Sequence, residues 1–157
     1  MSILNRKESY RFVGFNLLPL EKYLELVLRV GIGFIWIWMA VVPKLILPER
    51  GTMMTKMASW LIPFTIPLPL LTKGIAMFEL ALGVLLILGL FTRFVSLLMI
   101  LMLAAIFIGL WPYVPQKGIT SALAHLLLKD IPLTAATFCL FVKGGGPYSL
   151  DARQGRA

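Results

Sequence analysis

Residues 26–47 read LVLRVGIGFIWIWMAVVPKLIL, an apolar run interrupted by only two charged side chains, Arg29 and Lys44. A helix needs about 20 predominantly apolar residues to cross the hydrocarbon core of a bilayer. The run is therefore long enough to span a membrane, and it predicts a membrane helix over about residues 23–47.

Three further apolar runs of similar length follow, at about residues 70–91, 94–113 and 119–142. The chain has 157 residues, of which 59% are hydrophobic and 14% charged. Soluble domains carry about 25% charged residues, so this chain lacks the side chains for a water-exposed surface. We predict an all-α membrane protein in which residues 1–157 form a single membrane domain, a bundle of four transmembrane helices.

The connection at residues 48–69 is the one long segment between predicted spans. It is too short to cross the membrane and is interrupted by prolines, which a continuous helix does not tolerate. Its middle places Met53, Met54, Met57, Ala58 and Leu61 on one helical face. This pattern predicts an interfacial helix that lies flat on the membrane, with an apolar loop as the alternative.

The basic residues indicate orientation, because cytoplasmic loops of membrane proteins are enriched in Lys and Arg. With four spans, eight basic residues fall on the side of both termini: Arg6, Lys7, Arg11, Lys22, Arg93, Lys143, Arg153 and Arg156. Five fall on the other: Lys44, Arg50, Lys56, Lys73 and Lys117. We expect both termini to be cytoplasmic, in a bacterial-type inner membrane. The net charge is +8, and the Lys and Arg residues lie mostly at the borders of the apolar runs. The expected partners are therefore membrane lipids and not nucleic acid.

Charged residues inside the predicted spans are candidates for function, because each costs at least about 2.5–3.5 kcal/mol in hydrocarbon unless it is paired or hydrated. Arg29 and Lys44 share one face of the first span, which should point into the bundle. Glu79 lies inside the second span, with Lys44 and His125 as its expected partners. Glu25, one turn before Arg29, offers the alternative that the first-span charges only neutralise each other.

The fourth predicted span is the most polar and carries His125, Lys129 and Asp130. Pro132 follows, and a proline inside a helix removes a backbone hydrogen bond and favours a kink. We expect a polar pocket there, with Asp130 in reach of Arg29. The candidate ligand-binding or proton-handling residues are thus Arg29, Lys44, Glu79, His125, Lys129 and Asp130, with purely structural ion pairs as the alternative.

Several chemistries are excluded by the residues themselves. One histidine and one cysteine cannot build a zinc site or a bis-histidine haem site, so we expect no metal and no covalently held cofactor. The sequence also lacks a CxxC pair, a GxGxxG loop and a P-loop. We expect no catalytic residues of a familiar kind.

The chain resembles the DoxX/DoxD-like family of integral membrane proteins. The resemblance rests on Arg29, Gly33 and Lys44-Leu45 in the first span, on the ELALG run at 79–83 with Gly89-Leu90 and Thr92-Arg93, and on GPYSLDA at 146–152. It implies a four-span inner-membrane protein associated with redox complexes, such as thiosulfate:quinone oxidoreductase or a superoxide dismutase assembly. The long proline-rich connection at 48–69 departs from the family pattern.

Our leading hypothesis is an accessory, non-catalytic membrane subunit of an oxidoreductase-type complex, with partner protein subunits and an intramembrane pocket for a quinone or a similar lipophilic molecule. The rival hypothesis is a purely structural membrane anchor or scaffold. A small proton-coupled transporter is a weaker alternative, because the sequence has no inverted repeat.

Overall fold

The computed structural model describes residues 11–12, 15–16, 18–61, 66–113, 115 and 122–155. It is helical apart from one short antiparallel pairing of β1 (Arg11–Phe12) with β2 (Phe15–Asn16), and α2 (Leu18–Glu21) follows. The remaining elements are α3 (Leu24–Ala40), η1 (Val41–Ile46), α4 (Pro48–Ala58), η2 (Ser59–Leu61), α5 (Leu68–Leu88), α6 (Thr92–Leu110), η3 (Trp111–Tyr113), α8 (Ala122–Lys143) and α9 (Leu150–Arg153).

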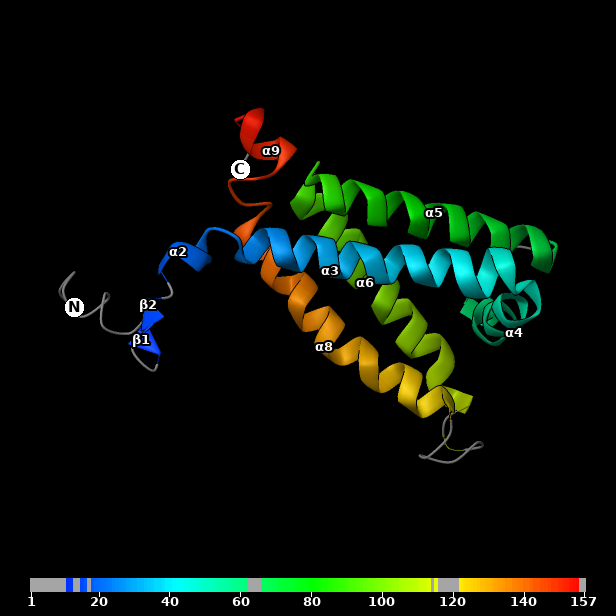
Figure 1. Ribbon diagram of the computed structural model, residues 1–157. Helices are drawn as coiled ribbons and strands as arrows, with labels where there is room; N and C mark the ends of the chain where they lie inside the picture. Colours follow the sequence, from blue (N-terminus) through cyan, green and yellow to red (C-terminus); the bar gives the residue numbers. More distant parts are fainter. Residues whose placement is uncertain are drawn as a thin grey trace.

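Four long helices form the bundle, with α3 packed mainly on α5 and α6 mainly on α8 (Figure 1). Three described helical stretches are long and apolar enough to cross a membrane: Leu24–Ile46, Leu68–Leu88 and Thr92–Tyr113. The first three predicted spans are therefore confirmed to within a few residues. The 22-residue α8 occupies most of the fourth predicted run.

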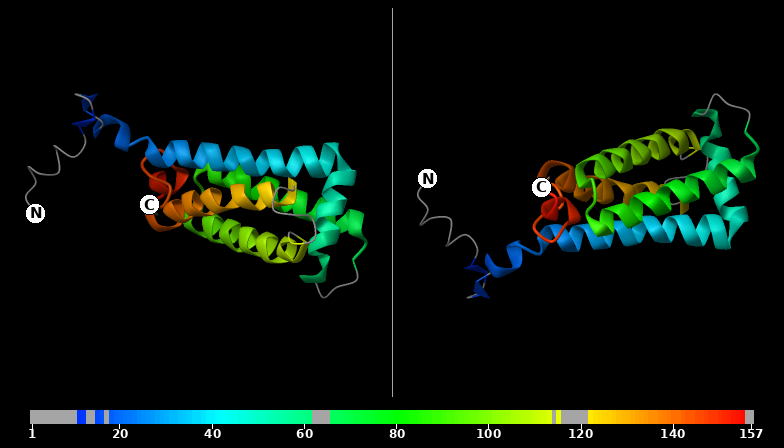
Figure 2. Two further views of the ribbon diagram at one scale, coloured as in Figure 1. Left: turned by 90° about the horizontal axis from the view of Figure 1, so that it is seen from below. Right: turned by 90° about the horizontal axis from the view of Figure 1, so that it is seen from above.

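The connection at 48–69 contains a helix of its own, α4, which runs across one end of the bundle and not along it (Figure 2). The short helices α2 and α9 lie at the opposite end (Figures 1 and 2). The predicted apolar face of this connection consists of Met53, Met54, Met57, Ala58 and Leu61, and these side chains lie outside the described part of the structure.

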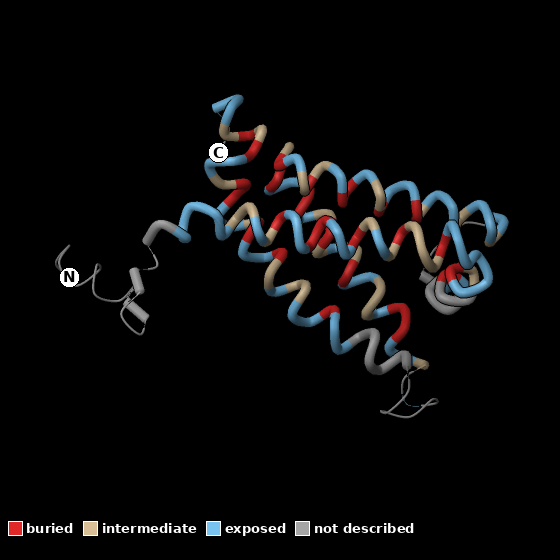
Figure 3. The backbone as a smooth tube through the Cα atoms, viewed as in Figure 1, coloured by how far each residue is buried: buried red, intermediate tan, exposed pale blue. Residues whose placement is uncertain are grey.

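Burial follows the pattern of a protein surrounded by lipid. Narrow stripes of buried residues face the centre of the bundle, and the outer faces are exposed (Figure 3). Large apolar side chains are freely exposed on those outer faces, including Val27, Phe34 and Leu101 at 57–65%. Water would penalise such a surface and hydrocarbon would not, so the exposed side chains agree with membrane insertion. The core cluster comprises Ile32, Trp36, Leu82, Leu86, Val95, Met99, Leu103 and Leu140.

Two glycines bring α3 and α5 into close contact. A Cβ atom on Gly33 would lie 2.7 Å from the carbonyl oxygen of Gly83, and a Cβ on Gly83 would lie 2.9 Å from the carbonyl oxygen of Gly33. Such close approach of two backbones is how small residues promote helix association in lipid, where no hydrophobic force acts between helices. The pair fixes the point at which α3 crosses α5.

The regular helix of α3 gives way to a π-helical turn, η1, at Pro43 and Lys44. Pro43 has no N–H, so it cannot donate to the carbonyl of Met39 one turn earlier. By contrast, α8 continues as one helix through Pro132, and the kink that the sequence predicts there stays a prediction. The opened turn therefore lies in the first predicted span and not in the fourth. π-helical turns of this kind occur frequently at functional sites.

The close contact of α3 and α5 predicts the effect of enlarging Gly83. Gly83→Val would force the two helices apart, and overpacking of this kind typically costs about 1–3 kcal/mol. Unfolding followed by circular dichroism in mixed detergent micelles should show this loss. Gly74→Val on the same helix is the matched control, because a Cβ there meets no atom within 4 Å. Equal stability of the two variants would contradict the contact.

Candidate functional site

A cavity of about 330 Å³ lies in the half of the bundle nearer α4. Residues from all four long helices and from η1 and α4 line it: Ile35, Trp36, Met39, Lys44, Thr55, Ile75, Phe78, Glu79, Met102, Leu103, Ala105, Ile106, Leu110, Lys129, Asp130 and Leu133. Its walls are mostly apolar, with a few polar groups, which is the usual composition of a small-molecule site. Ile35 and Phe78, two of the lining residues, are also 40% and 45% exposed on the outer surface.

The predicted ion pair between the first two spans is present in this cavity. Lys44 of η1 pairs with Glu79 of α5, and both side chains are less than 9% exposed. The Lys44 ammonium also donates to the Met39 carbonyl at 3.2 Å. This is the carbonyl to which Pro43 cannot donate. Pro43 therefore leaves the acceptor free, and Lys44 uses it. The opened turn thus supplies an acceptor for a cation that would otherwise be incompletely bonded inside the membrane.

A second ion pair comes from neighbouring residues of α8. The Lys129 ammonium donates to Asp130 Oδ1 at 2.7 Å, and Asp130 is almost fully buried while the Lys129 side chain is 41% exposed. Adjacent helical residues do not share a face, so the flexible stem of Lys129 must fold back for this contact. The described lining residues of the cavity therefore include two cations and two carboxylates, and the formal charges of these four balance.

Trp36 provides the unsatisfied polar group of the cavity. Its side chain is 4% exposed, and its indole Nε1 has no hydrogen-bond partner in the described part of the chain. A buried N–H without an acceptor costs free energy, so it marks a position where an added acceptor would stabilise the structure. The sequence had placed Trp36 on the inward face of the first span without assigning it a role.

The helix α4 closes the end of the cavity. Gly51 packs directly on η1, where a Cβ would lie 2.8 Å from the Cα of Lys44. Thr55, one turn later, lines the cavity and donates to the Gly51 carbonyl at 2.9 Å. Trp60 Nε1 donates to the Gly109 carbonyl at 3.1 Å and so fastens this segment to α6.

Arg29 lies in the other half of the bundle, away from the cavity. It is fully buried. Its Nη2 donates to the Tyr148 carbonyl at 3.0 Å, and its Nη1 donates to the Ile87 carbonyl at 3.4 Å. The negative charges of Asp151 and Glu25 interact electrostatically with the positive charge of Arg29. Glu25 itself lies 3.5 Å from Lys143 of α8. The expected partnership with Asp130 is wrong, because Asp130 pairs with Lys129 at a different depth.

The segment after α8 folds back to hold this region together. Asp151 accepts hydrogen bonds from the backbone N–H groups of Phe91 and Thr92 at 2.7 Å each, so it caps the first turn of α6. Its own N–H donates to the Gly89 carbonyl. Gly89 has φ +66°, and a Cβ there would overlap Arg29. We call Arg29, Gly89, Ser149 and Asp151 the C-terminal clamp.

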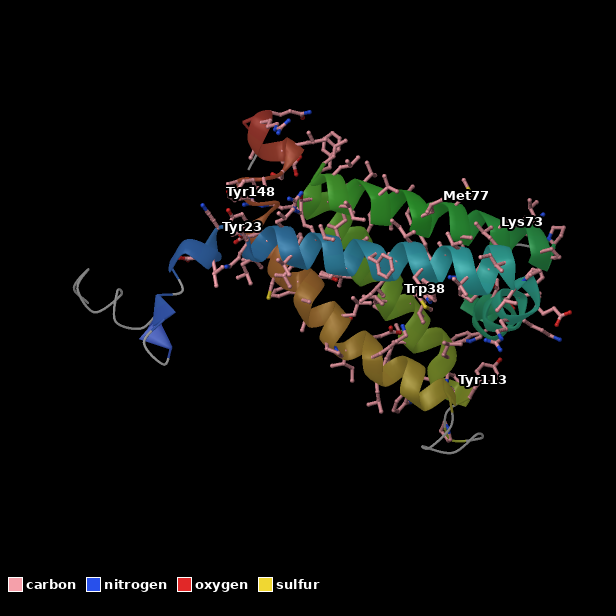
Figure 4. All side chains as sticks on the ribbon, viewed as in Figure 1. Tyr23, Trp38, Lys73, Met77, Tyr113 and Tyr148 are labelled. Carbon is pink, nitrogen blue, oxygen red and sulfur yellow. The ribbon has the colours of Figure 1, made fainter. Side chains whose placement is uncertain are left out.

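Two tyrosines flank the clamp at the end of the bundle. The rings of Tyr23 and Tyr148 stack with centroids 5.2 Å apart, and Figure 4 shows them side by side. The hydrogen bond shared with Tyr148, together with the Lys22 ammonium near the ring, lowers the pKa of Tyr23. The same hydrogen bond raises the pKa of Tyr148. The pair joins the start of α3 to the turn before α9.

Of the six candidate residues, four lie together. Lys44, Glu79, Lys129 and Asp130 line one cavity, and Arg29 belongs to the C-terminal clamp. The backbone of His125 is part of α8, but its side chain lies outside the described part of the structure. Sequence reasoning missed Thr55 and the free N–H of Trp36. A threonine one turn after a glycine in the connecting helix, and a tryptophan on the face of Lys44, were the available signals.

The DoxX family model matches residues 24–111, which is more than half of the chain. The chain belongs to the DoxX family. No curated protein and no solved structure matches it.

The DoxX match covers α3 to α6 and therefore includes the Lys44–Glu79 pair. It ends before α8 and α9, so the Lys129–Asp130 pair and the GPYSLDA segment lie outside it. This DoxX protein is a multi-pass integral membrane protein, as its apolar helices show. Its cavity combines elements inside and outside the matched region.

The buried Lys44–Glu79 pair predicts non-additive effects of mutation. Breaking a buried ion pair leaves one charge uncompensated and typically costs about 3–5 kcal/mol, whereas replacing both partners with apolar residues is often neutral. Lys44→Met and Glu79→Leu should each lower the free energy of unfolding in detergent, and the double variant should recover most of the loss. Lys73→Met, an exposed cation on α5, is the control. Additive losses would show that the two residues do not interact.

Proposed function

We propose that this DoxX protein binds a neutral lipophilic molecule with a hydrogen-bond-accepting headgroup, of the quinone type, as an accessory subunit of a redox assembly. The observation that carries the proposal is the buried, unpartnered indole N–H of Trp36 in a cavity that also holds two ion pairs. The redox assembly is what the family resemblance implies. The chemistry of electron transfer then belongs to partner subunits.

The charge balance of the cavity supports a neutral headgroup. Lys44 with Glu79 and Lys129 with Asp130 already neutralise one another. A carboxylate or phosphate headgroup would enter a low-dielectric site without a spare counter-charge, at a high desolvation cost. A quinone carbonyl has no charge and accepts a hydrogen bond, which is what the Trp36 N–H lacks.

The volume of the cavity agrees with such a headgroup. About 330 Å³ is at the lower end of the usual range of small-molecule pockets, about 300–1,000 Å³. Exposed lining residues such as Ile35 and Phe78 connect it to the outer surface that lipid would contact. A lipophilic ligand would therefore enter sideways from the bilayer, and no route through water is needed.

We further propose that α8 is the fourth span and that both termini are cytoplasmic in a bacterial-type inner membrane. The helices α2 and α9 lie at one end of the bundle and α4 lies at the other, as an even number of spans requires (Figure 2). Lys22, Arg93, Lys143 and Arg153 belong to the first end, so the positive-inside rule puts that end in the cytoplasm. The cavity then opens in the outer half of the membrane.

The proposed orientation predicts opposite labelling of the two ends. In a Cys139→Ser background, Glu49→Cys on α4 should react with a membrane-impermeant maleimide added outside intact cells. Arg153→Cys on α9 should react only after the membrane is permeabilised. Both residues are exposed in the structure, so accessibility to the reagent does not limit the comparison. The reverse pattern would overturn the proposed orientation.

The proposed ligand site predicts a selective effect of removing one N–H group. Trp36→Phe should lower the amount of co-purified quinone roughly three- to tenfold, because a neutral hydrogen bond contributes about 0.5–1.5 kcal/mol. The protein would be extracted from native membranes, and its bound lipophiles would be quantified by mass spectrometry. Since the N–H has no partner among the described residues, folding should be retained.

Trp38→Phe is the matched control, because Trp38 lies on the same helix with 55% exposure and does not line the cavity (Figure 4). The scaffold alternative predicts that neither substitution changes the retained lipophiles. If wild-type protein retains no quinone above the level in its bulk lipid, the ligand proposal is wrong and the scaffold role stands.

A further inference from the structure

A second hollow runs along the outside of the bundle between α3 and α8. Its volume is about 310 Å³, and every residue that lines it except Lys129 is apolar: Val27, Leu28, Gly31, Ile32 and Ile35 from α3, and Pro132, Leu133 and Ala136 from α8. We call it the α3–α8 groove. Val27 is 65% exposed, so this wall of the groove faces the surroundings of the bundle.

The groove adjoins the headgroup cavity. Ile35, Lys129 and Leu133 line both hollows. From Ile35 the groove extends to Val27, eight residues or about 12 Å along α3, in the direction of α9 and away from α4. It begins beside the cavity, near the middle of the Leu24–Ile46 span, and leads toward the end of the bundle at which α9 lies.

The two hollows divide by chemistry as well as by position. The cavity holds the Lys44–Glu79 and Lys129–Asp130 pairs and the Trp36 N–H, and the groove, apart from Lys129 at the edge of the cavity, is lined by apolar residues. The cavity has room for a ring headgroup but not for a long chain in addition. Any chain attached to that headgroup must leave the cavity, and the groove is an apolar path that starts at its edge.

Gly31 leaves the wall of the groove open. A Cβ atom built at Gly31 meets no atom within 4 Å, whereas a Cβ at Gly33, two residues later, would lie within 3 Å of Gly83 and Ile87. The packing of α3 on α5 therefore requires a glycine at position 33, and it does not require one at position 31. A glycine in a helix is unfavourable relative to alanine by roughly 0.5–1 kcal/mol, so its only local effect here is to keep the groove wide.

We propose that the α3–α8 groove binds the hydrocarbon chain of the same molecule whose headgroup lies in the cavity. The ligand is then a single-chain, isoprenoid-type amphiphile with a neutral ring headgroup, and not a compact aromatic compound. This inference rests on the proposed function, because it requires an occupied headgroup cavity. The two hollows share Ile35, Lys129 and Leu133 as walls, which favours the chain of this ligand over an unrelated phospholipid lying against the bundle.

The inference is tested by separating headgroup binding from chain binding. The probes are a benzoquinone without a side chain and the same benzoquinone with a decyl chain. Their binding to the full chain in lipid nanodiscs is measured by quenching of tryptophan fluorescence, with protein-free nanodiscs correcting for partition. Gly31→Leu fills the groove from α3 and should weaken binding of the decyl probe about tenfold, since it displaces buried methylene groups. Binding of the probe without a chain should not change.

Gly74→Leu is the matched control, because Gly74 is also an exposed helical glycine with open space around it and lines neither hollow. It should alter neither probe. Gly31→Ala, a smaller change, should give an intermediate loss for the decyl probe, and it provides the same test if the leucine variant does not fold.

The outcomes separate this inference from the function on which it rests. If both probes bind and Gly31→Leu affects them equally or not at all, the groove does not hold the chain, and the headgroup site stands. If Gly31→Leu instead displaces only co-purified phospholipid, the groove is a lipid contact and the inference is overturned. If neither probe binds wild-type protein, the headgroup site itself is wrong, and the inference fails with it.

Discussion

A cation at each end of the first spanning helix is the constraint on which the rest of this structure depends. Arg29 and Lys44 stand on the inward face of one apolar helix, and neither can be left unpaired in hydrocarbon. Arg29 donates through Nη1 and Nη2 to the backbone carbonyls of Ile87 and Tyr148, and the carboxylates of Asp151 and Glu25 act on its charge. Lys44 is satisfied by Glu79 and by a carbonyl in the opened turn of η1. Because Arg29 and Lys44 have different kinds of partners, the two ends of the bundle differ in structure.

The end at Arg29 is tight. Four segments that are distant in sequence meet there: the start of α3, the α5–α6 turn, the end of α8 and α9. Asp151 caps α6 and acts on Arg29, so one carboxylate links three of these segments. The requirement for φ +66° and for the absence of a side chain at Gly89 follows from this crowding. Most polar groups at this end bond to one another, although Arg29 Nε and Thr92 Oγ1 are buried without a partner in the described part of the chain.

The end at Lys44 is open. Here the α3–α5 pair and the α6–α8 pair diverge, and α4 lies across the gap (Figures 1 and 2). Both ion pairs of the cavity are formed, yet the Trp36 N–H is left without a partner in the described part of the chain. A structural cluster tends to satisfy its members internally, and a ligand site leaves capacity for its ligand. Buried polar atoms without a partner among the described residues also occur at Arg29, Thr92 and Ser96, so it is the position of the Trp36 donor in the wall of the cavity that favours the ligand role over a purely structural one.

The sequence predicted the membrane class and the positions of the first three spans, because hydropathy depends only on neighbouring residues. It also predicted the pairing of Lys44 with Glu79, because a buried charge needs a partner and few charged residues were available inside the spans. It named Glu25 as a carboxylate near Arg29 but could not predict Asp151. On the helical wheel Asp130 was as plausible as any other, and only the fold-back after α8 brings Asp151 close. The sequence likewise predicted a kink at Pro132 and no irregularity at Pro43, where the π-helical turn lies, since a proline in a helix indicates a missing hydrogen bond but not how neighbours replace it.

The contact of Gly33 with Gly83 explains how the two ends stay different. It holds α3 on α5 near the middle of both helices, so the spacing of that pair is set there and not by the cavity. Gly31, on the outer side of the same turn, packs against nothing and opens the α3–α8 groove. One short GIG sequence therefore gives α3 a face that packs and a face that leaves room. Occupation of the cavity and groove would change contacts between α3 and α8 while the C-terminal clamp and the α3–α5 crossing remain in place, so ligand binding and assembly of the bundle are physically separable.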